Sequence, residues 1–142
     1  MIPELKGKTA ELNNSFSPSF KAKNILHAVG GGPRLLRDGE VDITGEQERF
    51  QADILNGRAP RTALGLTEDN HLLLLTIDGR QSALSIGMTL EETAEILKEL
   101  GAVEAMNLDG GASARMVIRG FTMNSPSADR LISNGVIVNK KN

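Results

Sequence analysis

The stretch TLEETAEILKELGAVEAMNLDGG, residues 89–111, contains the clearest structural signals in the chain. Thr89 followed three residues later by Glu92 forms a capping box, which marks the start of a helix. Apolar side chains then recur at helical spacing until a glycine gives a stop signal. The pattern predicts a helix over residues 90–100, followed at once by a strand over residues 103–108.

Short apolar runs bounded by turn residues predict most of the remaining elements as strands. Residues 61–80 are expected to form two antiparallel strands joined by a turn at 68–70. The run 72–77 is expected to be central in the sheet, because it is apolar on both faces. Only a weak helix is drawn, at 46–54. Further strands or hairpins are expected at 25–29, at 34–40 with a turn signal at Asp38-Gly39, at 115–124 with a turn at Arg119-Gly120, and at 131–138.

The order of these elements indicates the fold class. Strands outnumber helices and several are linked as hairpins, which predicts an α+β fold. We expect a mixed, mostly antiparallel sheet packed with one well-defined helix and one weaker helix. A chain of 142 residues is the length of one domain. We assign that domain to residues 24–142 and interpret the polar residues 1–23 as an N-terminal arm or loop.

Composition excludes several classes of function. The 16 basic and 18 acidic residues give a net charge of -2, which argues against nucleic acid or an anionic membrane as partner. Absence of cysteine excludes disulfides, thiolate ligands and a cysteine nucleophile. The first residues lack a signal-peptide pattern, and no apolar run predicts a membrane span. With no Trp or Tyr, a bound sugar is expected to be held mainly by hydrogen bonds and charge.

Two Asp-Gly pairs that follow predicted strands are the candidate reactive groups. Asp109 follows the strand at 103–108, and Asp78 follows the run 72–77, with Arg80 two residues further on. Two carboxylates near an arginine suit acid/base chemistry on an anionic substrate. The adjacent glycines let backbone amides approach an anion. Because Asp-Gly is also a common turn dipeptide, either pair alone is more simply explained as a turn.

Other reactive-looking residues favour ordinary structural explanations. The triple glycine at 30–32 lacks the lysine and helix of a phosphate loop, and Ser113 lacks the GxSxG elbow of a serine hydrolase. His27 and His71 are expected on separate strands, so a metal site built on them is not predicted, and no cofactor is expected. A divalent cation is a minority alternative, with oxygen ligands from Asp78, Asp109 and Asn107.

Five separated motifs together resemble the phosphodiester glycosidase family, whose members cleave a sugar from a phosphodiester. The motifs occur in order and cover roughly residues 24–138. They are GGGPRLLRDG (30–39), APRTALG (59–65), LLTIDGRQ (74–81), SIGMTLEETAEILKELGAVEAMNLDGGAS (85–113) and NSPSADRLISNGVIV (124–138).

The resemblance implies a cleft that binds a small glycoside or sugar phosphodiester. Its motif positions make Asp78 and Asp109 the candidate catalytic residues. The residues expected to bind substrate or phosphate are Arg61, Thr62, Arg80, Asn107, Gly110, Gly111, Ser113, Asn124 and Ser127.

Roles for these residues follow from the chemistry of the leaving group. The phosphate that leaves already carries charge, so binding it with cations matters more than protonating it. We expect Arg61 and Arg80 to bind the phosphate, assisted by the backbone amides of residues 110–111. Asp78 and Asp109 are expected to share two tasks, in either order. One is to activate water or stabilise the anomeric carbon, and the other is to orient the arginines.

Departures from the family pattern suggest a second class of function. Ala112 stands where the family has a third glycine, and Ala114 and Arg115 follow Ser113 in place of small hydroxyl residues. The family domain normally continues upstream, so we expect a truncated domain or one that completes its sheet with a partner. The alternative is therefore an inactive binding or assembly module that forms a homo-oligomer. Relatives are often exported or lysosomal, and these first residues show no such signal.

Overall fold

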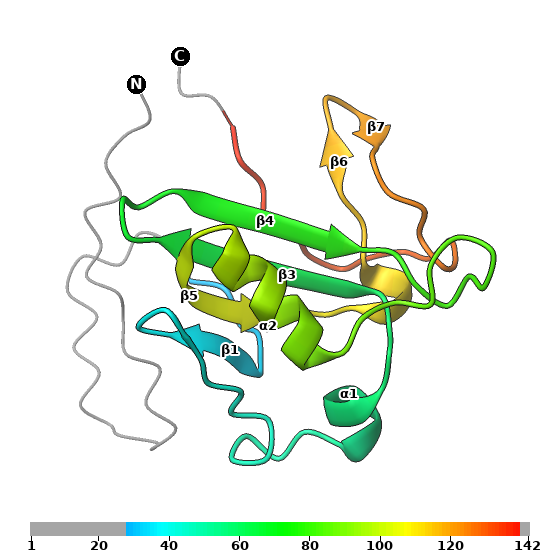
Figure 1. Ribbon diagram of the computed structural model, residues 1–142. Helices are drawn as coiled ribbons and strands as arrows, with labels where there is room; N and C mark the ends of the chain where they lie inside the picture. Colours follow the sequence, from blue (N-terminus) through cyan, green and yellow to red (C-terminus); the bar gives the residue numbers. More distant parts are fainter. Residues whose placement is uncertain (1–27, 140–142) are drawn as a thin grey trace.

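The computed structural model describes residues 28–139 as an antiparallel sheet with a helix on one face (Figure 1). The five-stranded sheet has the order β2-β1-β5-β3-β4, and every described pairing is antiparallel. Its strands are β1 (Arg34–Arg37), β2 (Glu40–Val41), β3 (Arg61–Thr67), β4 (Leu72–Ile77) and β5 (Ala102–Asn107). The other elements are α1 (Ala52–Asn56), α2 (Leu90–Glu99), the 3-10 helix η1 (Gly111–Ser113) and a hairpin of β6 (Val117–Ile118) and β7 (Phe121–Thr122). The α+β class is confirmed.

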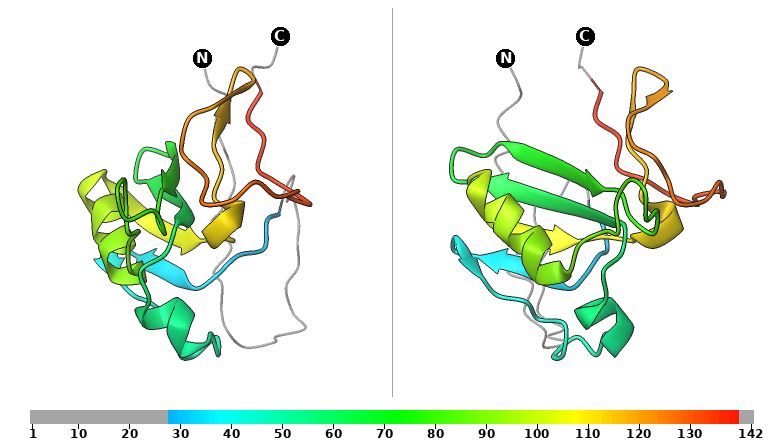
Figure 2. Two further views of the ribbon diagram at one scale, coloured as in Figure 1. Left: turned by 90° about the vertical axis from the view of Figure 1, so that its right-hand side faces the viewer. Right: turned by 45° about the vertical axis from the view of Figure 1, so that its right-hand side comes forward.

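Helix α2 forms where the sequence predicts it and covers one face of the sheet (Figure 2). The capping box is complete, because Thr89 Oγ1 accepts from the Glu92 amide at 3.2 Å and the Thr89 amide donates to Glu92 at 3.0 Å. The buried side of α2 packs against strand residues of the core, namely Leu35, Leu36, Ala63, Ala102 and Ala105. Burying each leucine of this kind contributes about 1.5–3 kcal/mol. Among the helices of residues 28–139, none is long and apolar enough to span a membrane.

Antiparallel pairing brings four strand ends to one edge of the sheet. Arg61, the first residue of β3, pairs with Ile77, the last residue of β4. Asn107, the last residue of β5, pairs with Ala63, and Arg34 at the start of β1 pairs with Met106. The loops after β4 and β5 therefore leave the sheet at the same edge, and the β6–β7 hairpin projects beyond it (Figure 1).

Three predicted turns are confirmed. β3 and β4 form a hairpin around residues 68–70, and β1 turns into β2 at Asp38-Gly39. β6 and β7 turn at Arg119-Gly120, where both residues have positive φ.

The expectation that residues 72–77 are central is wrong. β4 is at one end of the strand order among the described residues. Leu72 and Leu74 are 43% and 42% exposed. An apolar run predicts that a strand can be buried on both faces, but it does not specify which strands lie beside it.

Two other expectations also differ from the structure. Residues 131–138 form no strand, and Leu131 is 97% exposed; within residues 28–139 they have no strand partner. The weak helix expected at 46–54 is replaced by a turn and by α1 at Ala52–Asn56, because Arg49 has a φ of 62° that no α-helix accommodates. The expected strand at 25–29 lies mostly outside the described residues, as does the arm at 1–23; Ala28 and Val29 are not in a strand.

Candidate active site

At the shared sheet edge, glycines in the loops after β4 and β5 pack against the backbone of Ala59 and Pro60. A Cβ on Gly79 would lie 2.7 Å from the Pro60 nitrogen, and one on Gly110 would lie 2.5 Å from the Pro60 oxygen. Gly87 has a φ of +92°, and its Cβ would lie 2.5 Å from the carbonyl of Ala59. Real Cβ atoms do not fit at such distances. These motif glycines therefore let four backbone segments pack directly on one another.

Asp109 presents its carboxylate at the surface of this edge. The residue is exposed and follows β5 by two positions. Within residues 28–139 its side chain makes no hydrogen bond and no ion pair. Asp109 is therefore a carboxylate whose oxygens are free, with respect to the described chain, to meet a substrate or a water molecule.

Asp78 has a different environment, because its carboxylate is already hydrogen-bonded to the chain. Oδ1 accepts from Asn124 Nδ2 at 2.9 Å, and both carboxylate oxygens accept from the Ser125 amide at 3.0 Å. The Asp78 carbonyl accepts from Ser85 Oγ at 2.6 Å. Asp78 thus joins the loop after β4 to the segment after the β6–β7 hairpin.

Arg80 brings a cation beside the turn that contains Asp109. Its φ of 58° is in the left-handed region, and the residue is exposed. Its Nη1 lies 3.3 Å from the position that a Cβ on Gly111 would occupy. No ion pair with a described carboxylate neutralises this guanidinium.

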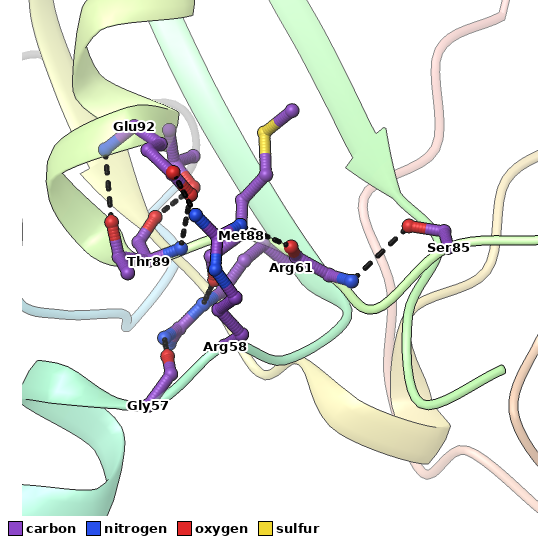
Figure 3. A network of polar contacts seen from close by, with 9 residues as sticks. Gly57, Arg58, Arg61, Ser85, Met88, Thr89 and Glu92 are labelled. Atoms are coloured by element: carbon purple, nitrogen blue, oxygen red, sulfur yellow. Dashed lines mark hydrogen bonds and ion pairs between the residues drawn. The ribbon is translucent and has the colours of Figure 1, made fainter. Parts of the chain in front are cut away.

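Arg61 lies at the same edge, in a network of polar contacts with Gly57 and Met88 (Figure 3). It is buried, with 4% of its surface exposed. Its Nε donates to the Met88 carbonyl at 2.9 Å. Its Nη2 donates to the carbonyls of Ile54 at 3.0 Å and Gly57 at 2.6 Å. Burial, and secondarily the positive charge of Arg80, lower the pKa of Arg61, although an arginine stays protonated at neutral pH. Arg61 joins the end of α1 to the segment before α2.

The other predicted site residues are divided between the edge and the interior. Asn107 is buried, and its Nδ2 donates to the carbonyls of Gly32 and Leu108, at 2.9 Å and 2.8 Å. Buried side-chain oxygens with no hydrogen-bond partner in the described chain include Thr62 Oγ1 and Asn107 Oδ1. Partly exposed residues near the edge are Gly110, Ser113, Asn124 and Ser127.

The backbone amide of Gly111 is not available to an anion in this conformation. It donates to the Pro60 carbonyl at 2.9 Å. For this amide to assist phosphate binding, as the sequence analysis predicts, its hydrogen bond to Pro60 would first have to open. A glycine in sequence can indicate either a ligand contact or close backbone packing, and here packing takes the amide.

Two residues at this edge were missed by the sequence analysis. Gln81 Nε2 donates to the Ser125 carbonyl at 2.6 Å, and Ser125 Oγ donates to Gln81 Oε1 at 3.1 Å. Both residues stand beside predicted ones, Gln81 after Arg80 and Ser125 after Asn124. Their 44-residue separation gives no local signal that they meet.

A separate hollow of about 380 Å³ lies between α1 and the start of α2. It is lined by Ile43, Gly45, Glu46, Leu55, Asn56, Thr89 and Glu91. Its charged side chains are both acidic, so it does not suit a phosphate. Within the described chain, no cluster of three or more His, Cys, Asp or Glu side chains has the arrangement of a metal site.

Comparison with known proteins identifies relatives of this chain. The mouse N-acetylglucosamine-1-phosphodiester alpha-N-acetylglucosaminidase is 38% identical over 113 residues, which cover 72% of this chain and 21% of the mouse protein. The catalytic domain of the zebrafish enzyme of the same name, auto-inhibited by its pro-peptide, superposes with a TM-score of 0.62 at 31% identity. That match covers 70% of this chain and 34% of the zebrafish chain.

A second solved structure gives the same result. A hypothetical protein from Synechocystis superposes with a TM-score of 0.62 at 32% identity, over 68% of this chain and 18% of that protein. The chain thus spans about a fifth of the mouse relative and a third of the zebrafish domain. The sequence also matches the phosphodiester glycosidase family over residues 5–139, so the chain belongs to that family.

Proposed function

We propose that this chain carries a hydrolytic site for a sugar 1-phosphodiester, in which Asp109 and Arg80 meet the substrate. The observation that supports this most directly is the position of Arg80, whose guanidinium lies against Gly111 in the turn that begins with Asp109. A carboxylate and a cation that have no partners within residues 28–139 lie at one sheet edge, and they match the two ends of such a substrate, the anomeric carbon and the phosphate. The names of the mouse and zebrafish relatives, which describe a phosphodiester glucosaminidase, agree with this chemistry.

The proposed step is hydrolysis at the anomeric carbon. Water attacks that carbon, and its proton passes to the Asp109 carboxylate. The bond from the carbon to the phosphate oxygen breaks, and the phosphate leaves as a monoester with the electron pair. Arg80 binds the phosphate in charge-assisted hydrogen bonds and stabilises the charge that develops on it.

The two arginines that were expected to share the phosphate have unequal parts in this proposal. The Nε and Nη2 groups of Arg61 are already bonded to backbone carbonyls. Arg61 contributes a buried positive charge and a fixed start to β3, while Arg80 makes the contact with phosphate. Thr62, Asn107, Ser113, Asn124 and Ser127 remain the proposed lining of the site.

Substitution of the free carboxylate tests the proposal. Asp109→Asn is expected to lower kcat for a sugar 1-phosphodiester by at least about a hundredfold, because it removes the proton acceptor. The matched control is Asp38→Asn, whose side chain is 90% exposed in the β1–β2 turn at the other end of the sheet. Both variants should unfold at the temperature of the original chain. Full turnover by Asp109→Asn would refute the assignment.

A homo-oligomeric binding module is the second candidate, favoured by exposed apolar side chains. Leu72 and Leu74 on β4 are more than two fifths exposed, and Leu131 is 97% exposed. Large exposed apolar surfaces commonly mark protein interfaces. Light scattering over a range of concentrations, combined with the hydrolysis assay, separates the candidates. An inactive oligomer supports the module, and an active species supports the hydrolase.

A further inference from the structure

We propose that Asp78 is a positioning residue, which acts with Gln81 to hold Arg80 in the geometry that receives a phosphodiester. The two side chains bind the Asn124-Ser125 segment, and we call these four residues the clasp. The inference rests on the proposed function, since it concerns how the cation of the same site is presented.

The first anchor of the clasp is the Asp78 carboxylate. It accepts from the amide side chain of Asn124 and from the backbone amide of Ser125. Asn124 extends the connection, because its Nδ2 also donates to the Ala114 carbonyl at 3.0 Å and its Oδ1 accepts from the Met116 amide at 2.9 Å. Asp78 is therefore bonded to the residue that closes the base of the β6–β7 hairpin.

The second anchor is Gln81, which forms a reciprocal pair of hydrogen bonds with Ser125. One bond runs to the Ser125 carbonyl and the other comes from the Ser125 hydroxyl. The backbone of Gln81 is also fixed, because it exchanges hydrogen bonds with Ser85 at 2.9 Å and 2.7 Å. Asp78 and Gln81, at the two ends of residues 78–81, therefore both bind the Asn124-Ser125 segment.

Arg80 lies between the two anchors and needs them. Its backbone is in the left-handed region, which is unfavourable for a non-glycine residue unless the surroundings hold it. Its side chain is long and exposed, so an unrestrained guanidinium would lose much conformational entropy on binding a ligand. With an anchor on each side, the backbone of Arg80 is restrained and its guanidinium starts from a position beside Gly111 before a ligand arrives.

The same hydrogen bonds distinguish positioning from direct contact. A carboxylate that activates water must offer an oxygen to that water. The Asp78 oxygens already accept hydrogen bonds from Asn124 Nδ2 and the Ser125 amide. If Asp78 bound a water or a substrate instead, these hydrogen bonds would break and the clasp would open. Asp109 has no such partners in the described chain and keeps the direct role.

Binding of diethyl phosphate, a small phosphodiester, tests the inference without requiring turnover. The probe is titrated into the full 142-residue chain, with the amide resonances of Gly110 and Gly111 and the Arg80 side chain followed by NMR. Arg80→Ala is expected to abolish measurable binding. Asp78→Asn is expected to weaken binding about tenfold, which corresponds to about 1.4 kcal/mol.

A second variant breaks the clasp without touching Asp78. Gln81→Met removes the amide that binds Ser125 and is expected to weaken binding about fivefold, which corresponds to about 1 kcal/mol. Its matched control is Gln51→Met, since the Gln51 side chain makes no capping hydrogen bond at α1. That control should bind like the original chain. If Asp78→Asn does not fold, Gln81→Met and its control decide the question.

The outcomes separate this inference from the proposed reaction. In hydrolysis of a sugar 1-phosphodiester, each clasp variant should raise KM more than it lowers kcat, and its pH profile should keep the shape of the original. A lost limb of that profile in Asp78→Asn, or unchanged phosphate binding in Gln81→Met, overturns the positioning role. If the clasp variants weaken diethyl phosphate binding but the original chain hydrolyses no sugar phosphodiester, the proposed reaction is wrong and the positioning role stands.

Discussion

The start of β3 and the loop after β4 each bring one motif arginine to the same sheet edge, yet the two regions differ in what surrounds the charge. Arg61 is 4% exposed and bonded to three backbone carbonyls. Arg80 is exposed and has no carboxylate partner among the described residues. In sequence both are arginines inside family motifs, so burial and partners separate a structural cation from one that can meet a ligand.

The difference follows from what each region connects. Arg61 lies where the end of α1 and the segment before α2 both present carbonyl groups to the interior (Figure 3). A planar guanidinium presents its N–H donors in a fixed fork that can reach carbonyls from separate segments, whereas a lysine ammonium is a compact point charge on a flexible stem. The loop after β4 instead turns outward at Arg80, and its hydrogen bonds are made by the residues on either side.

The largest expected effect is on stability, from Arg61. Arg61→Met is expected to lower the free energy of unfolding by about 2–4 kcal/mol, because three carbonyls lose their donor in a buried place. Arg80→Met, an equal change at the exposed arginine, should alter stability by less than about 0.5 kcal/mol. Chemical denaturation of both variants measures the contrast. Equal losses would show that burial does not distinguish the two regions.

The next effect tests how closely the Arg80 region is packed. Gly111 has a φ of +58°, and a Cβ there would lie 3.3 Å from Arg80 Nη1. Gly111→Ala is expected to cost about 1–2 kcal/mol of stability from the backbone and to weaken diethyl phosphate binding by moving the guanidinium. Gly101→Ala is the control, because Gly101 has a φ of +88° with nothing within 4 Å of its Cβ. Gly101→Ala should lose similar stability and bind diethyl phosphate normally. If both variants lose binding equally, the contact with Arg80 is not the cause of the loss in Gly111→Ala.

Local patterns predicted the parts of the fold that depend on neighbours in sequence. The capping box, the helix it starts and the two hairpins all follow from residues a few positions apart. The place of β4 at the end of the strand order does not, because a run such as 72–77 contains no information about which strand lies beside it. Residues 131–138 failed as a strand for the same reason, since a strand requires a partner.

The candidate site shows the same limit at the level of side chains. Asp78 and Asp109 both follow strands and both precede glycine, so the sequence left their roles open. Hydrogen bonds from Asn124 and Ser125, more than forty residues away, distinguish them. The resemblance to a family located the residues that gather at this edge, and only the tertiary contacts indicate which of them are free.

A third arginine, Arg58, provides the smallest effect and sharpens the comparison between buried and exposed cations. Arg58 lies three residues before the buried Arg61 and forms an exposed ion pair with Glu92 (Figure 3). Hydrogen bonding from the Thr89 amide, and then the contact with Arg58, lower the pKa of Glu92 from its usual 4.5. A carboxyl with a lowered pKa stabilises the fold above its unfolded-state pKa, and that contribution disappears as the pH falls through the folded value. The melting temperature of Glu92→Gln should therefore be slightly lower than that of the original chain at pH 7, and the two temperatures should become equal in strong acid. For Glu68→Gln, in the exposed β3–β4 turn, the difference from the original chain should not change with pH in this way. Because exposed ion pairs contribute little and are screened by salt, the difference at pH 7 should also shrink in high salt, while the loss from Arg61→Met should persist.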